Sequence, residues 1–101
     1  MIYTILVFTK LKKYKCGLSD FGDQRLVGYY KDKNKAILNV KNNSCDIFET
    51  CYHYALVEEV EEGLYNPAIN RWLFKFNLES GQYEQIEEPV FMKHECGYTI
   101  G

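Results

Sequence analysis

The chain has 101 residues, of which 47% are apolar and 16% aromatic, and its formal net charge is −2. This length is typical of one domain with one modest core, and the composition excludes an intrinsically disordered chain. A core of this size leaves little room for a deep enclosed active site. The sequence contains no Gly-rich phosphate loop, nucleophile elbow, zinc-protease motif or dinucleotide fingerprint. We therefore expect a protein that is not an enzyme and that uses no cofactor.

The charge is distributed unevenly along the chain. Residues 1–41 contain nine lysines and arginines against three aspartates, a net charge of +6. Residues 42–101 contain three lysines and arginines against eleven acidic residues, a net charge of −8. This polarity is compatible with two halves that attract each other in one fold, with a nucleic-acid-binding face, or with no functional consequence.

The first predicted element is a strand over Ile2–Leu11. Apolar residues occupy both of its alternating faces, which indicates a central strand covered on both sides. The apolar run Ile2–Phe8 is too short to span a bilayer, and it lacks a basic leader and a small-residue cleavage site. We therefore expect no membrane contact and a cytoplasmic location, where cysteines stay reduced.

A polar loop over Lys12–Asp23 is predicted next, followed by a second strand over Gln24–Tyr30. Gly28 lies inside this strand, which indicates a bulge or a close approach by another backbone.

A helix is predicted from Asp32 to at least Val40, because an aspartate at this position can cap the first turn and apolar residues then recur at helical spacing. The stretch Cys45–Cys51 is compatible with a second short helical piece. Residues 32–51 therefore form either one helix or two.

Three further strands are predicted, over Tyr54–Glu61, Arg71–Leu78 and Gln82–Glu87, and the last two are joined by a hairpin turn at residues 79–81 that ends in glycine. The middle strand of the three alternates cleanly, so that its large apolar side chains share one face. These side chains are Trp72, Phe74, Phe76 and Leu78, and we expect them to contact Ile37, Val40, Ile47 and Phe48.

The element order β-β-α-β-β-β predicts a single α+β domain over residues 1–89. We expect a four- to five-stranded, mostly antiparallel sheet with one or two helices packed on one face. Residues 90–101 are predicted to be a C-terminal tail, in which a short extra strand at Gly97–Ile100 is left open.

Part of this pattern resembles a class of short uncharacterised proteins encoded by Gram-positive bacteria and their mobile elements. The resemblance is carried by Arg25-x-Val27-Gly28-Tyr29-Tyr30, by the alanine-containing helix after it, and by Tyr54-Ala55-Leu56-Val57-Glu58-Glu59. It covers roughly residues 1–65 and implies the α+β fold with an acid-rich third strand. It implies no catalytic residues.

The richness in aromatic residues, which suit protein interfaces, predicts a protein-interaction module. Its partner would be another protein or a second copy of the chain, bound through the acidic third strand and the aromatic sheet surface. The predicted contact residues are Tyr29, Tyr30, Glu58, Glu59, Glu61 and Trp72. A solvated sheet edge protected by charge is the alternative interpretation of the glutamates.

A second hypothesis is a nucleic-acid-binding accessory protein. Four lysines interleaved with a tyrosine can contact phosphates and stack on a base. These residues are Lys10, Lys12, Lys13, Tyr14 and Lys15. A solvated loop is the alternative interpretation of the same residues.

A third hypothesis is a Cys2His2 zinc site. The pairs Cys51-x-His53 and His94-x-Cys96 each place a thiol and an imidazole on one side of an extended segment. Neither pair has the spacing common in structural zinc sites, and the chain has no Cys-x-x-Cys. Ordinary packing or surface positions are the alternative interpretation of these four residues.

Overall fold

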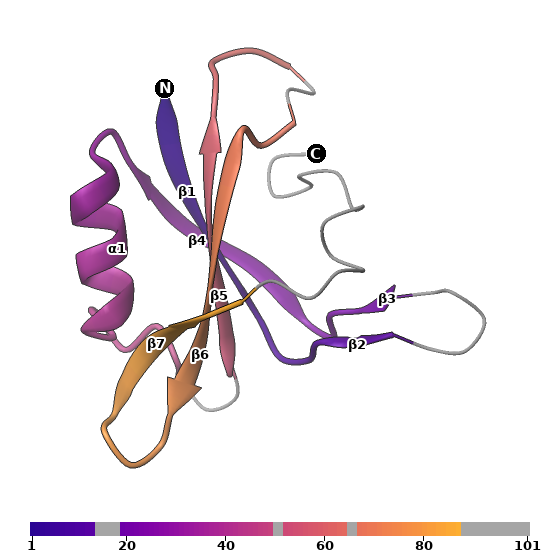
Figure 1. Cartoon of the computed structure of the whole chain (residues 1–101), viewed down its shortest axis with the longest axis vertical. Coiled ribbons are helices and arrows are strands. Elements are labelled where there is room, and N and C mark those ends of the chain that lie inside the picture. The colour runs from indigo at the N-terminus through magenta and orange to yellow at the C-terminus, as the bar shows by residue number, and fades with distance from the viewer. Residues whose placement is uncertain (14–18, 50–51, 65–66, 88–101) are drawn as a thin grey trace.

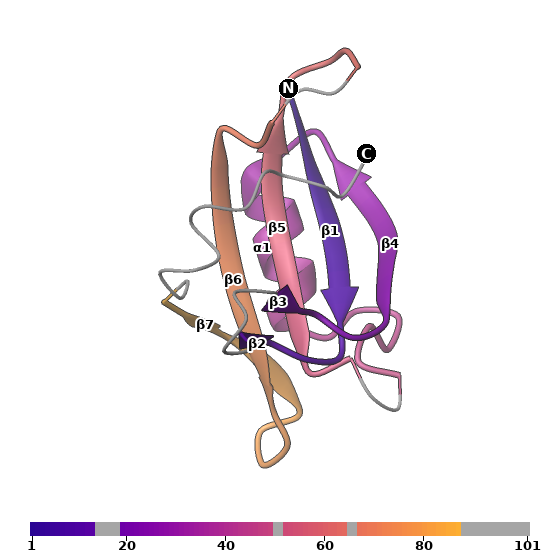
Figure 2. The same cartoon turned by 90° about the vertical axis from the view of Figure 1, so that its right-hand side faces the viewer.

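The computed structural model describes residues 1–13, 19–49, 52–64 and 67–87 (Figure 1). It confirms the predicted α+β class: one five-stranded antiparallel sheet has the strand order β4-β1-β5-β6-β7, and one helix contacts it on one face (Figures 1 and 2). The elements are β1 (Ile2–Phe8), β4 (Gln24–Tyr30), α1 (Lys33–Lys41), β5 (Tyr54–Val60), β6 (Asn70–Asn77) and β7 (Gln82–Ile86).

The strand β1 lies between β4 and β5, and both of its faces are buried. Ile5 and Val7 belong to the cluster of core residues that contacts α1. Phe8 belongs to a second cluster on the opposite face of the sheet. The prediction of a central strand covered on both sides is confirmed.

The core on the helix side joins α1 to the aromatic face of β6. Buried Ala36 and Val40 of α1 pack with buried Phe74 of β6. The half-buried members of this cluster include Ile37, Ile47, Phe48, Trp72 and Phe76, in agreement with the predicted contacts. Because one large buried apolar side chain contributes roughly 1.5 to 3 kcal/mol, this layer is a main source of stability.

Leu78 does not join this layer, and its predicted contact is wrong. Pairing of β6 with β7 ends at Asn77, whose side-chain oxygen accepts a hydrogen bond from the Glu79 amide at 2.9 Å. The chain therefore turns before Leu78, which is 71% exposed. Gly81 completes the turn with a φ of 70°, the left-handed conformation expected for glycine there.

The second core cluster lies on the sheet face opposite α1. It contains buried Phe8, Leu56 and Leu73, with half-buried Leu11 and Phe21 packed against them. The alternation of β6 therefore separates two apolar faces, rather than an apolar face from a purely polar one.

The predicted loop Lys12–Asp23 contains a small hairpin. The strand β1 ends at Phe8, and β2 (Lys12–Lys13) pairs with β3 (Ser19–Asp20) in a separate two-stranded sheet. This hairpin projects from the sheet on the side away from α1 (Figure 1).

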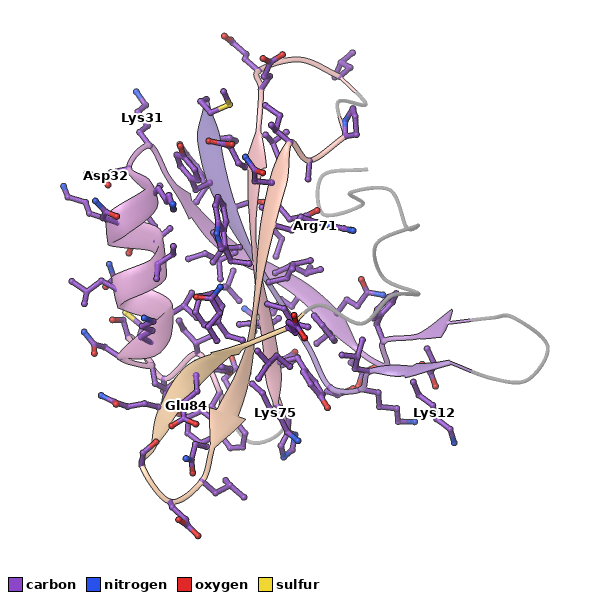
Figure 3. All side chains as sticks on the ribbon, in the orientation of Figure 1. Lys12, Lys31, Asp32, Arg71, Lys75 and Glu84 are labelled. Carbon is purple, nitrogen blue, oxygen red and sulfur yellow. The ribbon has the colours of Figure 1, made fainter. Side chains whose placement is uncertain are left out.

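The predicted N-cap of the helix is confirmed. The Asp32 carboxylate accepts hydrogen bonds from the amides of Asn34 at 2.8 Å and Lys35 at 3.4 Å. Asp32 itself is extended, with a φ of −115° and a ψ of 121°. It lies at the junction of β4 and α1 (Figure 3).

The same helix ends at Lys41 in a Schellman motif, so the predicted second helical piece is absent from the described part of Cys45–Cys51. Asn43 adopts a left-handed φ of 50°, and the amides of Asn43 and Ser44 donate to the carbonyls of Val40 and Asn39, each at 3.0 Å. The Asn43 side-chain oxygen also accepts a hydrogen bond from the Phe48 amide at 2.8 Å. These bonds turn the chain away from the helix axis.

The left-handed conformation of Asn43 yields a stability prediction. Asn43→Ala should destabilise the fold by about 2 kcal/mol, because alanine disfavours this conformation and cannot accept the Phe48 amide. Asn43→Gly should cost about half as much, because glycine keeps the backbone conformation. Urea unfolding measures both effects, with exposed Asn42→Ala as a control expected within about 0.5 kcal/mol of the wild type. Equal losses for the alanine and glycine variants would contradict this explanation.

Candidate partner-binding edge

The two outer strands of the sheet, β4 and β7, differ in what they expose (Figure 2). The strand β7 has only five residues and exposes Gln82, Glu84 and Gln85, the short polar type of edge that resists pairing with another chain. The strand β4 has seven residues and exposes Leu26 by 45%, Val27 by 39% and Tyr29 by 63%. Within the described residues no strand pairs with the side of β4 that faces away from β1. We call this side the β4 edge.

A cavity of about 340 Å³ follows the β4 edge. Six consecutive residues, Arg25 to Tyr30, line it. Because consecutive side chains of a strand point to opposite faces, a cavity lined by all six reaches the edge of the strand. Its lining by Ile5 of β1 shows that it also extends onto the α1 side of the sheet. It borders the side of β4 where a further strand would pair. We call it the edge cavity.

The opposite wall of the edge cavity is the segment that follows α1. Asn39 of the helix and Ser44 to Ile47 and Glu49 after it line this wall. Asn43, Cys45, Asp46 and Glu49 have positive φ angles of 50° to 56° without being glycine. Such residues cost of order 1 kcal/mol each and persist only where the surroundings hold them.

Two side-chain contacts hold this wall in place. The Ser44 hydroxyl donates to Oδ1 of Asn39 at 2.8 Å. The Arg25 guanidinium donates to the Glu49 carboxylate at 3.1 Å, which joins the wall to β4 across the cavity. Both partners of this ion pair are largely exposed, so it contributes at most about 1 kcal/mol to stability. The main effect of this ion pair is to hold the wall in position relative to β4.

Gly28 forms part of the floor of the edge cavity. It pairs with Ile5 in the ladder, and it therefore faces the α1 side of the sheet. The ladder shifts here, so that Val27 is an extra residue, and the predicted bulge is confirmed. A Cβ atom added at Gly28 would meet nothing within 4 Å. The predicted alternative of a close backbone approach is therefore wrong, and the space above Gly28 is open.

The predicted contact residues Tyr29, Tyr30 and Glu58 lie in different environments. Tyr29 and Tyr30 both line the edge cavity, but they project to opposite faces of β4. Glu58 is fully buried on the face opposite α1, where its neighbours in the ladder are Thr4 and Arg71. Figure 3 shows Arg71 on this same side of the sheet. Since β5 is the middle strand of the sheet, the interpretation of its glutamates as a solvated sheet edge is wrong.

Glu59 and Trp72 lie on the other face of the sheet, beside the first turn of α1. The Glu59 carboxylate accepts hydrogen bonds from the Tyr3 hydroxyl at 2.7 Å and from the Asn70 amide group at 2.8 Å. The Lys33 ammonium lies 4.8 Å from the centre of the Trp72 ring. Glu61 is exposed beyond the end of β5. The six predicted contact residues therefore form no single surface.

The residues of the nucleic-acid hypothesis belong to the β2–β3 hairpin and its approach. Exposed Lys10 lies 3.9 Å from the Asp20 carboxylate, and Lys12 is exposed on β2 (Figure 3). Lys13 is the second residue of β2. Tyr14 and Lys15 lie outside the described residues, and the hypothesis stays a prediction.

Of the residues of the zinc hypothesis, only His53 lies in the described part of the chain. Its imidazole ring packs edge-on against Phe48, with 5.2 Å between the ring centres. Cys51, His94 and Cys96 lie outside the described residues, as do the predicted tail and its extra strand. No group of metal-binding side chains occurs among the described residues, and the zinc site stays a prediction.

The sequence interpretation missed most of the edge cavity. It identified Tyr29 and Tyr30, but not Leu26, Val27 or the wall after α1. The available signal was Gly28 inside the predicted strand, which predicted the bulge but not the position of the strand in the sheet.

Comparisons with known proteins do not extend this description. No family model matches the chain, and neither the curated proteins nor the solved structures contain a match. The resemblance to short proteins of Gram-positive bacteria therefore stays a prediction. No helix in the described part of the chain is long and apolar enough to cross a membrane.

The contact between Tyr3 and Glu59 predicts a pH-dependent contribution to stability. The hydrogen bonds from Tyr3 and Asn70, together with the charge of Lys33, lower the pKa of Glu59 below its ordinary value. Because the folded-state pKa is lowered, the contribution is complete above the ordinary pKa of about 4.3 and is lost as the pH falls through the lowered value. Tyr3→Phe removes the largest cause. It should reduce stability at pH 7 and have a progressively smaller effect below about pH 4.

Urea unfolding at pH 7 and at about pH 3 tests this prediction. Tyr29→Phe is the matched control, because Tyr29 is largely exposed, and the control should show no such difference between the two pH values. A Tyr3→Phe effect that is equal at both pH values would contradict the assignment.

Proposed function

We propose that this protein is a small cytoplasmic, non-enzymatic protein-interaction module that binds an extended segment of a partner protein along the β4 edge. The observation that carries the proposal is the edge cavity, lined by six consecutive residues of an outer strand. The proposal keeps the predicted class of function and the predicted contacts Tyr29 and Tyr30 of β4. It leaves out the predicted glutamates and Trp72.

The physical basis of the proposal is the addition of a strand to a sheet. The backbone groups on an unpaired strand edge can hydrogen bond to an extended peptide, and this pairing supplies affinity with little dependence on sequence. Proteins usually protect such edges with charge or by making the strand short. The devices that we identify on β4 are the bulge at Val27 and the charge of Arg25, while Leu26 and Tyr29 remain exposed. The segment after α1 lies across the edge cavity from the strand.

Lysine substitutions on the β4 edge test this function, because lysine opposes edge pairing. A phage-displayed library of random dodecapeptides is selected on the wild-type protein, and the affinity of the selected peptides is measured for each variant. We expect Leu26→Lys and Tyr29→Lys to weaken binding at least tenfold. Leu38→Lys is the matched control, since Leu38 is a 58% exposed leucine on α1 outside the edge cavity, and it should stay within twofold of the wild type.

Two outcomes would contradict the proposal. One is a library that yields no peptide whose binding is weakened by Leu26→Lys and Tyr29→Lys. The other is a selected set that Leu38→Lys weakens as strongly as the edge variants.

Nucleic-acid binding is the second candidate function, favoured by the projection of the β2–β3 hairpin, with exposed Lys12, away from the sheet. A labelled single-stranded RNA or DNA should then shift on a native gel at low salt, and neutralising Lys10, Lys12 and Lys13 together should abolish the shift. No shift at low salt would remove this candidate.

A further inference from the structure

We propose that the space above Gly28 is a specificity pocket that receives one large apolar side chain from the bound segment. This inference rests on the proposed function, because it assumes that the segment pairs with the β4 edge. It adds which side chain the segment must carry and which residues of this chain select it.

The geometry of an added strand leads to this assignment. Alternate side chains of the added strand point to the α1 side of the sheet. On that side the edge cavity is bounded by Gly28 and Ile5 below and by Ile47 on the far wall. Ile5 is almost fully buried and Ile47 is half-buried in the helix-side core. A side chain that enters here leaves water for an apolar surface, which favours a large apolar residue.

Glycine at position 28 lies beside the bulge at Val27, but its own backbone conformation does not require glycine. Its φ lies outside the left-handed region, so its backbone suits any residue, and an added Cβ would contact nothing within 4 Å. Glycine inside a strand weakens the strand and often marks the approach of a ligand or another backbone. No described residue fills the space above Gly28, so we assign the space to the side chain of a partner.

The charged residues that line the edge cavity favour certain residues beside the apolar side chain of the bound segment. Arg25 and Glu49 form an ion pair at 3.1 Å and compensate each other. Asp46 is the remaining charged residue of the lining, and it is exposed. The lining therefore carries a net negative charge, which favours a neutral or basic segment over an acidic one.

Filling the pocket tests the inference. Gly28→Val should fold at least as stably as the wild type in urea unfolding, because the Cβ position is open and valine suits a strand. The dodecapeptide library selected on the wild type should be enriched in a large apolar residue at one position. Gly28→Val should bind those peptides at least tenfold more weakly, and Gly28→Ala should have an intermediate effect.

A separate variant tests whether Asp46 favours a basic residue in the bound segment. Asp46→Asn should abolish the preference for a basic residue next to the apolar one, while the preference for the apolar residue itself remains. An unchanged preference for basic neighbours in Asp46→Asn would overturn the role of Asp46.

The outcomes separate this inference from the proposed function. Selected peptides that are weakened by Leu26→Lys but not by Gly28→Val would overturn the pocket and leave edge binding in place. A library without edge-dependent peptides would overturn both. Light scattering at micromolar concentration tests whether a second copy of the chain occupies the β4 edge. A stable dimer that Leu26→Lys dissociates would show that it does. This result would overturn the assignment to a partner segment.

Discussion

The pairing of β1 with β5 is the constraint on which the rest of the structure depends. The two strands share seven residue pairs, from Ile2 with Val60 to Phe8 with Tyr54. Both faces of this pair are buried, and a shift by one residue would exchange the faces of one strand. In β5 such a shift would move the Glu58 carboxylate from the face opposite α1 to the apolar layer beneath the helix. The same shift would remove buried Ala55 and Val57 from that layer, and the loss of their packing opposes it. The strands β4 and β6 then pair on either side.

Local sequence signals predicted the elements that depend on local chemistry. Asp32 caps the helix because a carboxylate can reach the first free amides, and this needs no tertiary contact. Trp72, Phe74 and Phe76 share a face because strand geometry repeats every two residues. Leu78 continues the same alternation in sequence, but the hydrogen bond that Asn77 accepts in the turn ends the strand before it.

The candidate site was less predictable, because it depends on strand order and on backbone conformations without a clear sequence signature. The sequence identified β4 as a strand, but its place at the outside of the sheet follows from the pairing of β1 with β5. The far wall of the edge cavity depends on left-handed Cys45 and Glu49, residue types that rarely adopt this conformation. The burial of Glu58 also depends on strand order. An acidic residue in a strand does not indicate that the strand is central, so the sequence did not predict this burial.

The difference between the two outer strands has a consequence for assembly. A sheet that accepts strands at both margins can polymerise, because every added copy offers a new template. Here the far margin is β7, with five residues and exposed Glu84, which is unsuited to templating. In the proposed complex, this protein therefore offers an apolar acceptor edge at β4 and none at β7. A molecule with one acceptor edge cannot by itself link copies into a continuous sheet through both of its margins, which opposes growth into a cross-β fibre.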